Sequence, residues 1–162
     1  MANYEIRPLQ RHILKILSAV DKVCREHNLR YYIVDGTMLG AVRHGGFIPW
    51  DDDMDIGMPR KDYNILIKNA EQWLPAPYNL VCGENNKDYP LPFAKVEDTG
   101  TTVVENTYFK HIGGVYIDVF PLDGMPDNKK AQRKHLRKHK SKKKLLYFMS
   151  REPYKHGKGI RA

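Results

Sequence analysis

Four carboxylates crowd into five positions of this chain, at Asp51, Asp52, Asp53 and Asp55. Apolar residues border the group, and a glycine-rich segment precedes it within the stretch 35–58. Like charges this close together destabilise a folded domain unless a cation binds among them. An Asp-Asp-Asp sequence on its own would be an ordinary solvated turn. The fourth acid favours a site for a magnesium-like ion.

The acids lead into a segment with the alternation of a β-strand, residues 53–58. A side-chain period of two places Asp53 and Asp55 on one face and turns Met54, Ile56 and Met58 toward the core. The two aspartate Cα atoms are then expected roughly 7 Å apart. At that spacing their carboxylates can share one ion, or two ions held about 4 Å apart.

A further acid lies in the middle of an apolar strand, residues 115–120. Alternation places Asp118 on the face opposite the β-branched residues of this strand. An aspartate between apolar neighbours is uncommon without a partner. We therefore expect Asp118 to complete the ion site with Asp53 and Asp55.

The remaining periodicity predicts a single small α/β domain. At 162 residues and 41% hydrophobic composition, the chain is long enough to bury a core. Apolar residues at spacings of three and four predict a helix over 9–24, with Asn28 as its stop, and another between Pro59 and Pro75. Short strands are expected over Tyr31–Val34, Tyr78–Cys82, Leu91–Val96 and Thr101–Glu105.

A turn at Gly36 and Thr37 joins the first of these strands to a short helix, residues 38–43. We expect Thr37 to cap this helix and Gly45-Gly46 to end it. Backbone N–H groups, a hydroxyl and a helix N-terminus together favour a bound phosphate. Taken alone, Gly36 fits an ordinary strand-to-helix turn equally well.

Three other polar residues near this turn each have two interpretations. Arg43 and His44 are either ligands of the donor phosphates or residues that complement a helix C-terminus. Lys95 is either a phosphate ligand or a solvated lysine that faces outward. Trp50 is expected to pack into the domain.

The net charge of +8 is concentrated in the last part of the chain. Residues 1–128 hold 13 Lys and Arg against 18 Asp and Glu, whereas residues 129–162 hold 14 against one. We therefore divide the chain into a catalytic domain, 1–126, and a basic helical extension, 127–162. Because no aromatic residues interleave the lysines of 129–144, a solvated helix face is favoured there over a nucleic-acid surface. The apolar run 145–149 leads us to expect a piece of a longer protein.

Two segments of the chain resemble the LicD-type phosphotransferase family, within the nucleotidyltransferase fold that also includes the fukutin-related proteins. The first runs over 35–58 and includes Gly-Gly-Phe-Ile-Pro-Trp-Asp-Asp-Asp-Met-Asp, and the second is Tyr-Ile-Asp-Val-Phe-Pro-Leu-Asp-Gly at 116–124. The resemblance extends over about residues 29–124. It implies a small mixed sheet with flanking helices on one side.

The resemblance also implies roles for particular residues. Gly36 and Thr37 match the Gly-Ser/Thr element of the fold, Asp53 and Asp55 its metal-binding pair, and Asp118 its third carboxylate. The implied cofactor is Mg²⁺ or Mn²⁺. The implied reaction moves a phospho-alcohol such as phosphocholine from a CDP-linked donor to a sugar hydroxyl of a glycan, with release of CMP.

Two other functions remain open from the residues alone. One is nucleotidyl transfer to RNA or to a small-molecule hydroxyl, which would leave the nucleoside monophosphate on the acceptor. The other is a noncatalytic domain that binds a nucleotide or polyanion through residues 129–144, with strong salt dependence. If the protein transfers a phospho-alcohol, as the resemblance implies, no nucleic-acid partner is expected.

The chain also gives expectations about its surroundings. Its first residues lack the pattern of a secretory signal, and no stretch has the apolar length of a membrane span. We therefore expect a cytoplasmic protein, in which the basic tail is the place for any peripheral membrane contact.

Overall fold

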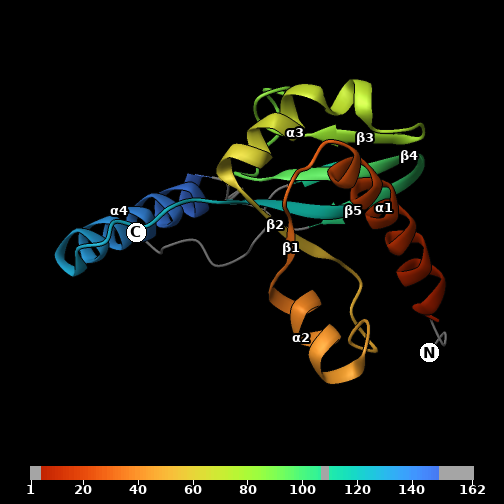
Figure 1. Cartoon of the computed structure of the whole chain (residues 1–162), viewed down its shortest axis with the longest axis horizontal. Helices are drawn as coiled ribbons and strands as arrows, with labels where there is room; N and C mark the ends of the chain where they lie inside the picture. Colours follow the sequence, from red (N-terminus) through yellow and green to blue (C-terminus); the bar gives the residue numbers. More distant parts are fainter. Residues whose placement is uncertain (1–4, 107–109, 150–162) are drawn as a thin grey trace, which may run out of the picture. The chain divides into compact units, whose positions relative to one another are not determined.

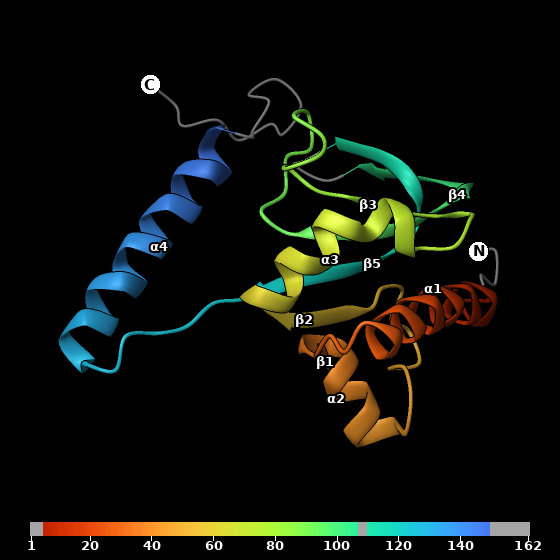
Figure 2. The same cartoon turned by 45° about the horizontal axis from the view of Figure 1, so that its top comes forward.

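The computed structural model describes residues 5–106 and 110–149. The chain divides into two compact units, one of residues 1–103 with 112–123 and the other of residues 104–111 with 124–162. The described elements appear in Figure 1 and in a second view in Figure 2. They are α1 (Arg7–Glu26), β1 (Tyr32–Ile33), α2 (Asp35–His44), β2 (Asp55–Pro59), α3 (Arg60–Trp73), β3 (Tyr78–Val81), β4 (Ala94–Asn106), β5 (Lys110–Leu122) and α4 (Lys129–Met149).

The five strands form one mixed sheet in the order β1-β2-β5-β4-β3. β2 runs parallel to β5, while β1 pairs with β2 and β3 pairs with β4 in antiparallel fashion. The predicted α/β class with a small mixed sheet is therefore confirmed. The parallel pair is central because it joins the two strands that carry the predicted acids.

One buried cluster joins α1 and α3 to a single face of the sheet. Ten of its members have an exposed fraction of 0%, among them Ile16, Val20, Ile56, Leu66 and Val119. Each such side chain contributes about 1.5–3 kcal/mol through the apolar surface that it buries. The predicted alternation in β2 is confirmed, since Met54, Ile56 and Met58 all point into this cluster. The acids of β2 and β5 are left on the other face.

The predictions of the helices α1 and α3 are confirmed, because each apolar stripe consists of residues close together in the sequence. α1 and α3 extend the predicted helices by a few residues at most, and Asn28 ends the first helical segment with a φ of 54°. The predicted strand 31–34 is shorter in the structure, where β1 covers Tyr32 and Ile33.

Two predicted strands are instead one, because β4 continues through the polar residues 97–100. Asp98 holds this segment in place. Its Oδ1 accepts the Gly100 N–H at 2.8 Å. Its Oδ2 lies 2.7 Å from Nε2 of His12, a residue of α1. The prediction of a turn here was wrong because a helix distant in sequence supplies the partner.

Helix α4 confirms the helix expected in the basic extension, and residues 150–162 lie outside the described residues. Asn128 begins this helix by accepting the Lys130 N–H at 2.8 Å through Oδ1. Among the helices of the described residues, none combines the length and the apolar character needed to cross a membrane.

Candidate functional site

The parallel pairing of β2 with β5 places Asp55 directly beside Asp118. Partner residues on neighbouring strands point to the same face, and the strands lie about 4.8 Å apart. The neighbours Ile56 and Val119 are both buried on the core side. Two acids predicted from separate segments therefore meet on the face opposite the core.

Asp55 lies among several other carboxylates. Burial, followed by the charges of Asp53, Asp118, Asp35 and Asp51, raises the pKa of Asp55 to about 7. Burial also raises the pKa of Asp53, and Asp51 and Asp52 raise it further. Raised pKa values of this kind indicate that the surrounding positive charge does not balance the charges of these carboxylates.

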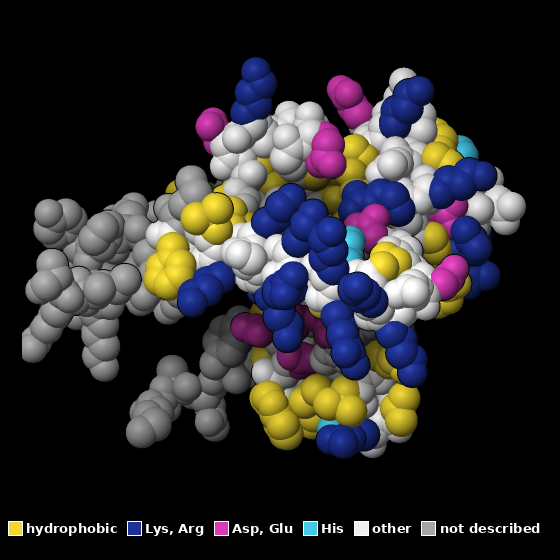
Figure 3. Space-filling model, turned by 90° about the vertical axis from the view of Figure 1, so that its left-hand side faces the viewer, with side chains coloured by type: hydrophobic (Ala, Val, Ile, Leu, Met, Phe, Trp, Pro, Cys, Tyr) yellow, Lys and Arg dark blue, Asp and Glu magenta, His cyan; other side chains and the backbone are white. Residues whose placement is uncertain are grey.

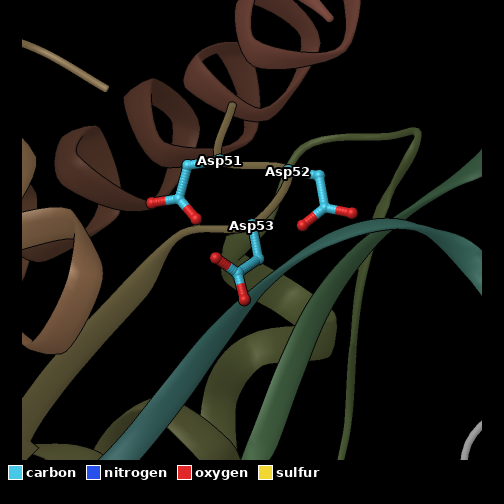
Figure 4. A group of neighbouring side chains, drawn as sticks. All are labelled: Asp51, Asp52 and Asp53. Atoms are coloured by element: carbon cyan, nitrogen blue, oxygen red, sulfur yellow. The ribbon is translucent and has the colours of Figure 1, made fainter. Parts of the chain in front are cut away.

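The loop before β2 carries three of these carboxylates, on Asp51, Asp52 and Asp53. One oxygen from each lies within 4.8 Å of the others. Figure 4 shows the three side chains pointing away from the same side of the loop. The strand begins at Asp55, two residues later than predicted, so Asp53 belongs to the loop. Within the described part of the chain, the loop set 51–53 is the group of three acids whose ligand atoms converge in this way. The predicted set, Asp53 with Asp55 and Asp118, shares Asp53 with the loop set, and the strand register places Asp55 beside Asp118.

Carboxylate oxygens are the ligands that Mg²⁺ and Mn²⁺ prefer. After burial, the charges of the neighbouring acids raise the pKa of Asp55, because like charges gathered on this face repel one another. A divalent cation bound there would relieve this repulsion. The donor set therefore fits such an ion.

The turn at Gly36 and Thr37 lies against the acidic loop. A Cβ placed on Gly36 would be 3.3 Å from Asp51 Oδ2, which is a tight contact. The Thr37 hydroxyl accepts the Asp55 N–H at 2.8 Å. Thr37 therefore fastens the start of α2 to β2.

The prediction that Thr37 caps this helix was wrong. α2 begins earlier, at Asp35, with Val34 at the cap position and no side-chain cap. The Thr37 hydroxyl instead accepts the N–H of Asp55, at the start of the strand that carries the site. Gly45 does end the helix, as predicted, with a φ of 64°.

Asp35 is a member of the site that the sequence analysis missed. It has a φ of 47°, and its charge helps to raise the pKa of Asp55. Residues held in the left-handed region cluster at functional sites, because surrounding structure must hold them there. The signal in the sequence was an acid directly before a glycine at the end of a strand.

Lys95 supplies a positive charge to this face from β4. Its side chain is 2% exposed, and its Nζ lies 3.0 Å from Asp118 Oδ1 and 3.1 Å from the ring centroid of Tyr116. The alternative of a solvated, outward-facing lysine was therefore wrong. Lys95 contacts one of the predicted metal ligands.

Aromatic residues continue the same face beyond Asp118. Phe120 follows it on the same side of β5, and its ring centroid lies 4.4 Å from that of Phe93. The alternation that places Asp118 on this face of β5 also places Phe120 there. The pair forms an apolar border to the acids.

Arg43 and His44 lie away from these carboxylates, in the last turn of α2. Seven residues separate Arg43 from Gly36, which is about 10 Å along the helix axis. His44 makes an edge contact with Trp50, with ring centroids 6.5 Å apart. The structure does not bring these two residues to the predicted phosphate turn.

The expectation that Trp50 packs into the domain was also wrong, because its side chain is 77% exposed. Met38, Leu39 and Val42 on α2 are exposed as well. Figure 3 shows apolar side chains gathered at the bottom of the view, the height at which Figure 1 places α2, with acidic side chains above them.

Comparison with protein families gives one match that covers most of the chain. Residues 28–153 match the family described as LicD/FKTN/FKRP, nucleotidyltransferase domain. The matched range contains the acids, the Gly36-Thr37 turn and Lys95.

Individual relatives are similar over shorter ranges. The chain is 31% identical over 141 residues to the lipopolysaccharide cholinephosphotransferase LicD of Haemophilus influenzae, which is 86% of this chain and 52% of the relative. It is 36% identical over 79 residues to the ribitol 5-phosphate transferase FKRP of Homo sapiens and of Mus musculus, which is 49% of this chain and 14% of each relative. The chain therefore spans about half the length of the first relative and less of the others.

Proposed function

Because this chain belongs to the LicD/FKTN/FKRP nucleotidyltransferase-domain family, we propose that it transfers a phospho-alcohol from a CDP-linked donor to a sugar hydroxyl of a glycan. The relatives are named for transfer of phosphocholine and of ribitol 5-phosphate, which are both phosphorylated alcohols. The observation that carries the proposal is the register of Asp55 with Asp118, beside Asp53.

In this proposal Asp53, Asp55 and Asp118 hold one or two divalent cations, Mg²⁺ or Mn²⁺. When bound, such an ion neutralises charge that develops on the phosphoryl oxygens. Asp51 and Asp52 lie beside Asp53 in the loop. Lys95 holds the Asp118 carboxylate from the neighbouring strand.

The start of α2 is the proposed binding site of the donor diphosphate. The first N–H groups of a helix have no partner within it, and they favour an anion. Gly36 lies so close to Asp51 that a larger side chain would make a tight contact there, and Thr37 ties this turn to Asp55. The Phe93 and Phe120 rings offer an apolar surface for the rest of the donor.

The transfer breaks one bond and forms another at the same phosphorus. The acceptor hydroxyl oxygen attacks the phosphorus distal to the nucleoside, and the bond from that phosphorus to the bridging oxygen of CMP breaks. The electron pair leaves with CMP. The proton of the acceptor hydroxyl passes to a carboxylate oxygen of the acidic group.

The test is release of CMP from CDP-choline and CDP-ribitol, with a sugar acceptor, by the full-length natural protein and its Asp55→Asn variant. We expect turnover that requires Mg²⁺ and that falls at least a hundredfold in the variant, because an interaction made in the transition state is lost. Recovery of the nucleoside monophosphate attached to the acceptor would instead identify a nucleotidyltransferase. Unchanged CMP release by the variant would contradict the proposed centre.

A further inference from the structure

Helix α4 is unusual in its charge. Its 21 residues contain ten Lys and Arg, two His and no acid. Of its described side chains, only that of Gln132 is not exposed. Between residues 129 and 144 the apolar residues are Ala131 and Leu136, so this part of the helix has no apolar stripe.

Four of its cations lie on one face. Lys130, Arg133, Lys134 and Arg137 follow one another at spacings of three and four, and so share a side of the helix over about 10 Å. A hollow of about 600 Å³ lies along this face, lined by Asn128, Lys130, Ala131, Arg133, Lys134 and Arg137. We call these four cations the cationic face. Arginine forks and lysine ammonium groups are the side chains that bind phosphate.

The charge of the cationic face is not balanced by the helix itself. Lys130 with Lys134 and Arg133 with Arg137 are like charges four residues apart, an arrangement that destabilises a helix. No carboxylate on α4 offsets them. A bound anion would stabilise the helix by supplying the missing charge.

The last turn of α4 adds apolar groups on the same side. Phe148 follows Lys130 by 18 residues, which is five full turns, and Leu145 lies one turn before it. Phe148 is 45% exposed and Leu145 is 59% exposed. The Lys144 ammonium lies 5.7 Å from the Phe148 ring centroid. Inorganic polyphosphate has no apolar part to contact these side chains, and Leu145 offers the bases of RNA no ring for stacking. The boundary of a lipid bilayer accepts aliphatic and aromatic side chains alike.

We propose that the cationic face of α4, together with Leu145 and Phe148, binds the surface of a membrane rich in anionic phospholipids. The headgroup phosphates occupy the hollow along the cationic face, and the two apolar side chains enter the interface. The helix lies on the membrane rather than across it. This inference does not depend on the proposed transfer reaction.

The test uses the 162-residue chain with vesicles of phosphatidylcholine, with and without phosphatidylglycerol, in a cosedimentation assay. The first variant changes the cationic face: Lys130→Gln, Arg133→Gln, Lys134→Gln and Arg137→Gln. The matched control removes the same charge from the other faces: Lys129→Gln, Lys138→Gln, Lys142→Gln and Lys143→Gln. Far-UV circular dichroism confirms that both keep their helix.

We expect the unchanged chain to bind only the vesicles that contain phosphatidylglycerol, and to bind less as salt is added. The cationic-face variant should lose affinity on the order of a hundredfold, and the control on the order of tenfold or less. Equal losses in the two variants would overturn the assignment of this face.

A third variant tests the apolar part, with Leu145→Ser and Phe148→Ser. We expect it to lose vesicle binding while it keeps its weak affinity for soluble polyphosphate. If the unchanged chain bound polyphosphate or RNA as tightly as vesicles, and this variant behaved like the unchanged chain, the partner would be a soluble polyanion and the membrane proposal would be wrong.

Discussion

The ammonium group of Lys95 lies 3.0 Å from Oδ1 of Asp118, on the strand next to the one that carries it. The Lys95 side chain is 2% exposed, so water screens this ion pair little. The pair fixes the orientation of one of the three predicted metal ligands. It also places a single positive charge next to a group of carboxylates that repel one another.

Replacement of Lys95 by methionine should therefore destabilise the protein. Loss of one partner from a buried ion pair leaves the other charge unbalanced, and we expect a decrease of about 3 kcal/mol in the free energy of unfolding. Urea denaturation in EDTA measures this change. Mg²⁺ should restore part of it, because a cation near Asp118 replaces the lost charge. Lys61→Met, at an exposed position of α3, is the control and should change stability by less than about 0.5 kcal/mol.

The two overlapping sets of carboxylates can be distinguished by single substitutions. Asp55→Asn should abolish the rise in Tm that Mg²⁺ produces, and should raise the Tm of the metal-free protein because one of several repelling acids is gone. Asp52→Asn should leave most of the Mg²⁺ effect, because Asp52 is exposed in the loop. Thermal denaturation with and without Mg²⁺ measures both. The reverse result would assign the ion to the loop set 51–53.

The stability of the metal-free protein should depend on the ionisation of Asp55. Its pKa is about 7 in the fold and about 3.9 in an unfolded chain. Because the folded value is the higher one, the contribution of Asp55 to stability is fully present below about pH 4 and is lost as the pH rises to about 7. Mg²⁺ competes with the proton, so the rise in Tm that it causes should grow over the same range.

This dependence is isolated by comparison with the Asp55→Asn variant, in which other titrating groups are unchanged. Thermal scans at several pH values between 5 and 8, in EDTA and in Mg²⁺, give the difference between the two proteins. A difference that does not change with pH would show that Asp55 ionises normally.

Gly114 is placed where no side chain fits. A Cβ there would lie 1.9 Å from the backbone oxygen of Asp98. Gly114→Ala should therefore force β4 and β5 apart and cost about 3 kcal/mol, measured by urea denaturation. Gly124→Ala is the matched control, since a Cβ on Gly124 would meet nothing within 4 Å. Equal stability of the two variants would contradict the close packing of these strands.

Local patterns in the sequence were enough to predict the helices and the faces of the strands. The apolar stripes of α1 and α3, and the alternation that separates Asp55 from Ile56, depend only on residues near one another in the chain. The acids were also evident, because an aspartate inside an apolar strand is uncommon.

Partners distant in the sequence explain what could not be predicted. Lys95 is buried because β4 lies beside β5, and the Thr37 hydroxyl accepts the Asp55 N–H because α2 begins beside β2. A threonine before a helical segment resembles a cap whether or not a strand takes its hydroxyl. The exposure of Trp50 likewise depends on which surfaces the folded chain leaves uncovered, and an aromatic side chain in isolation suggests the opposite.

The register of Asp55 with Asp118 joins positions 63 residues apart. Such a contact closes a long loop, so it adds to the contact order of the fold and forms slowly compared with α1 or α3. During synthesis, the acids 51–55 leave the ribosome well before β5 does. For that interval the nascent chain carries the acids of residues 51–55 without Asp118, so a short peptide from this segment would reproduce only part of the predicted ligand set.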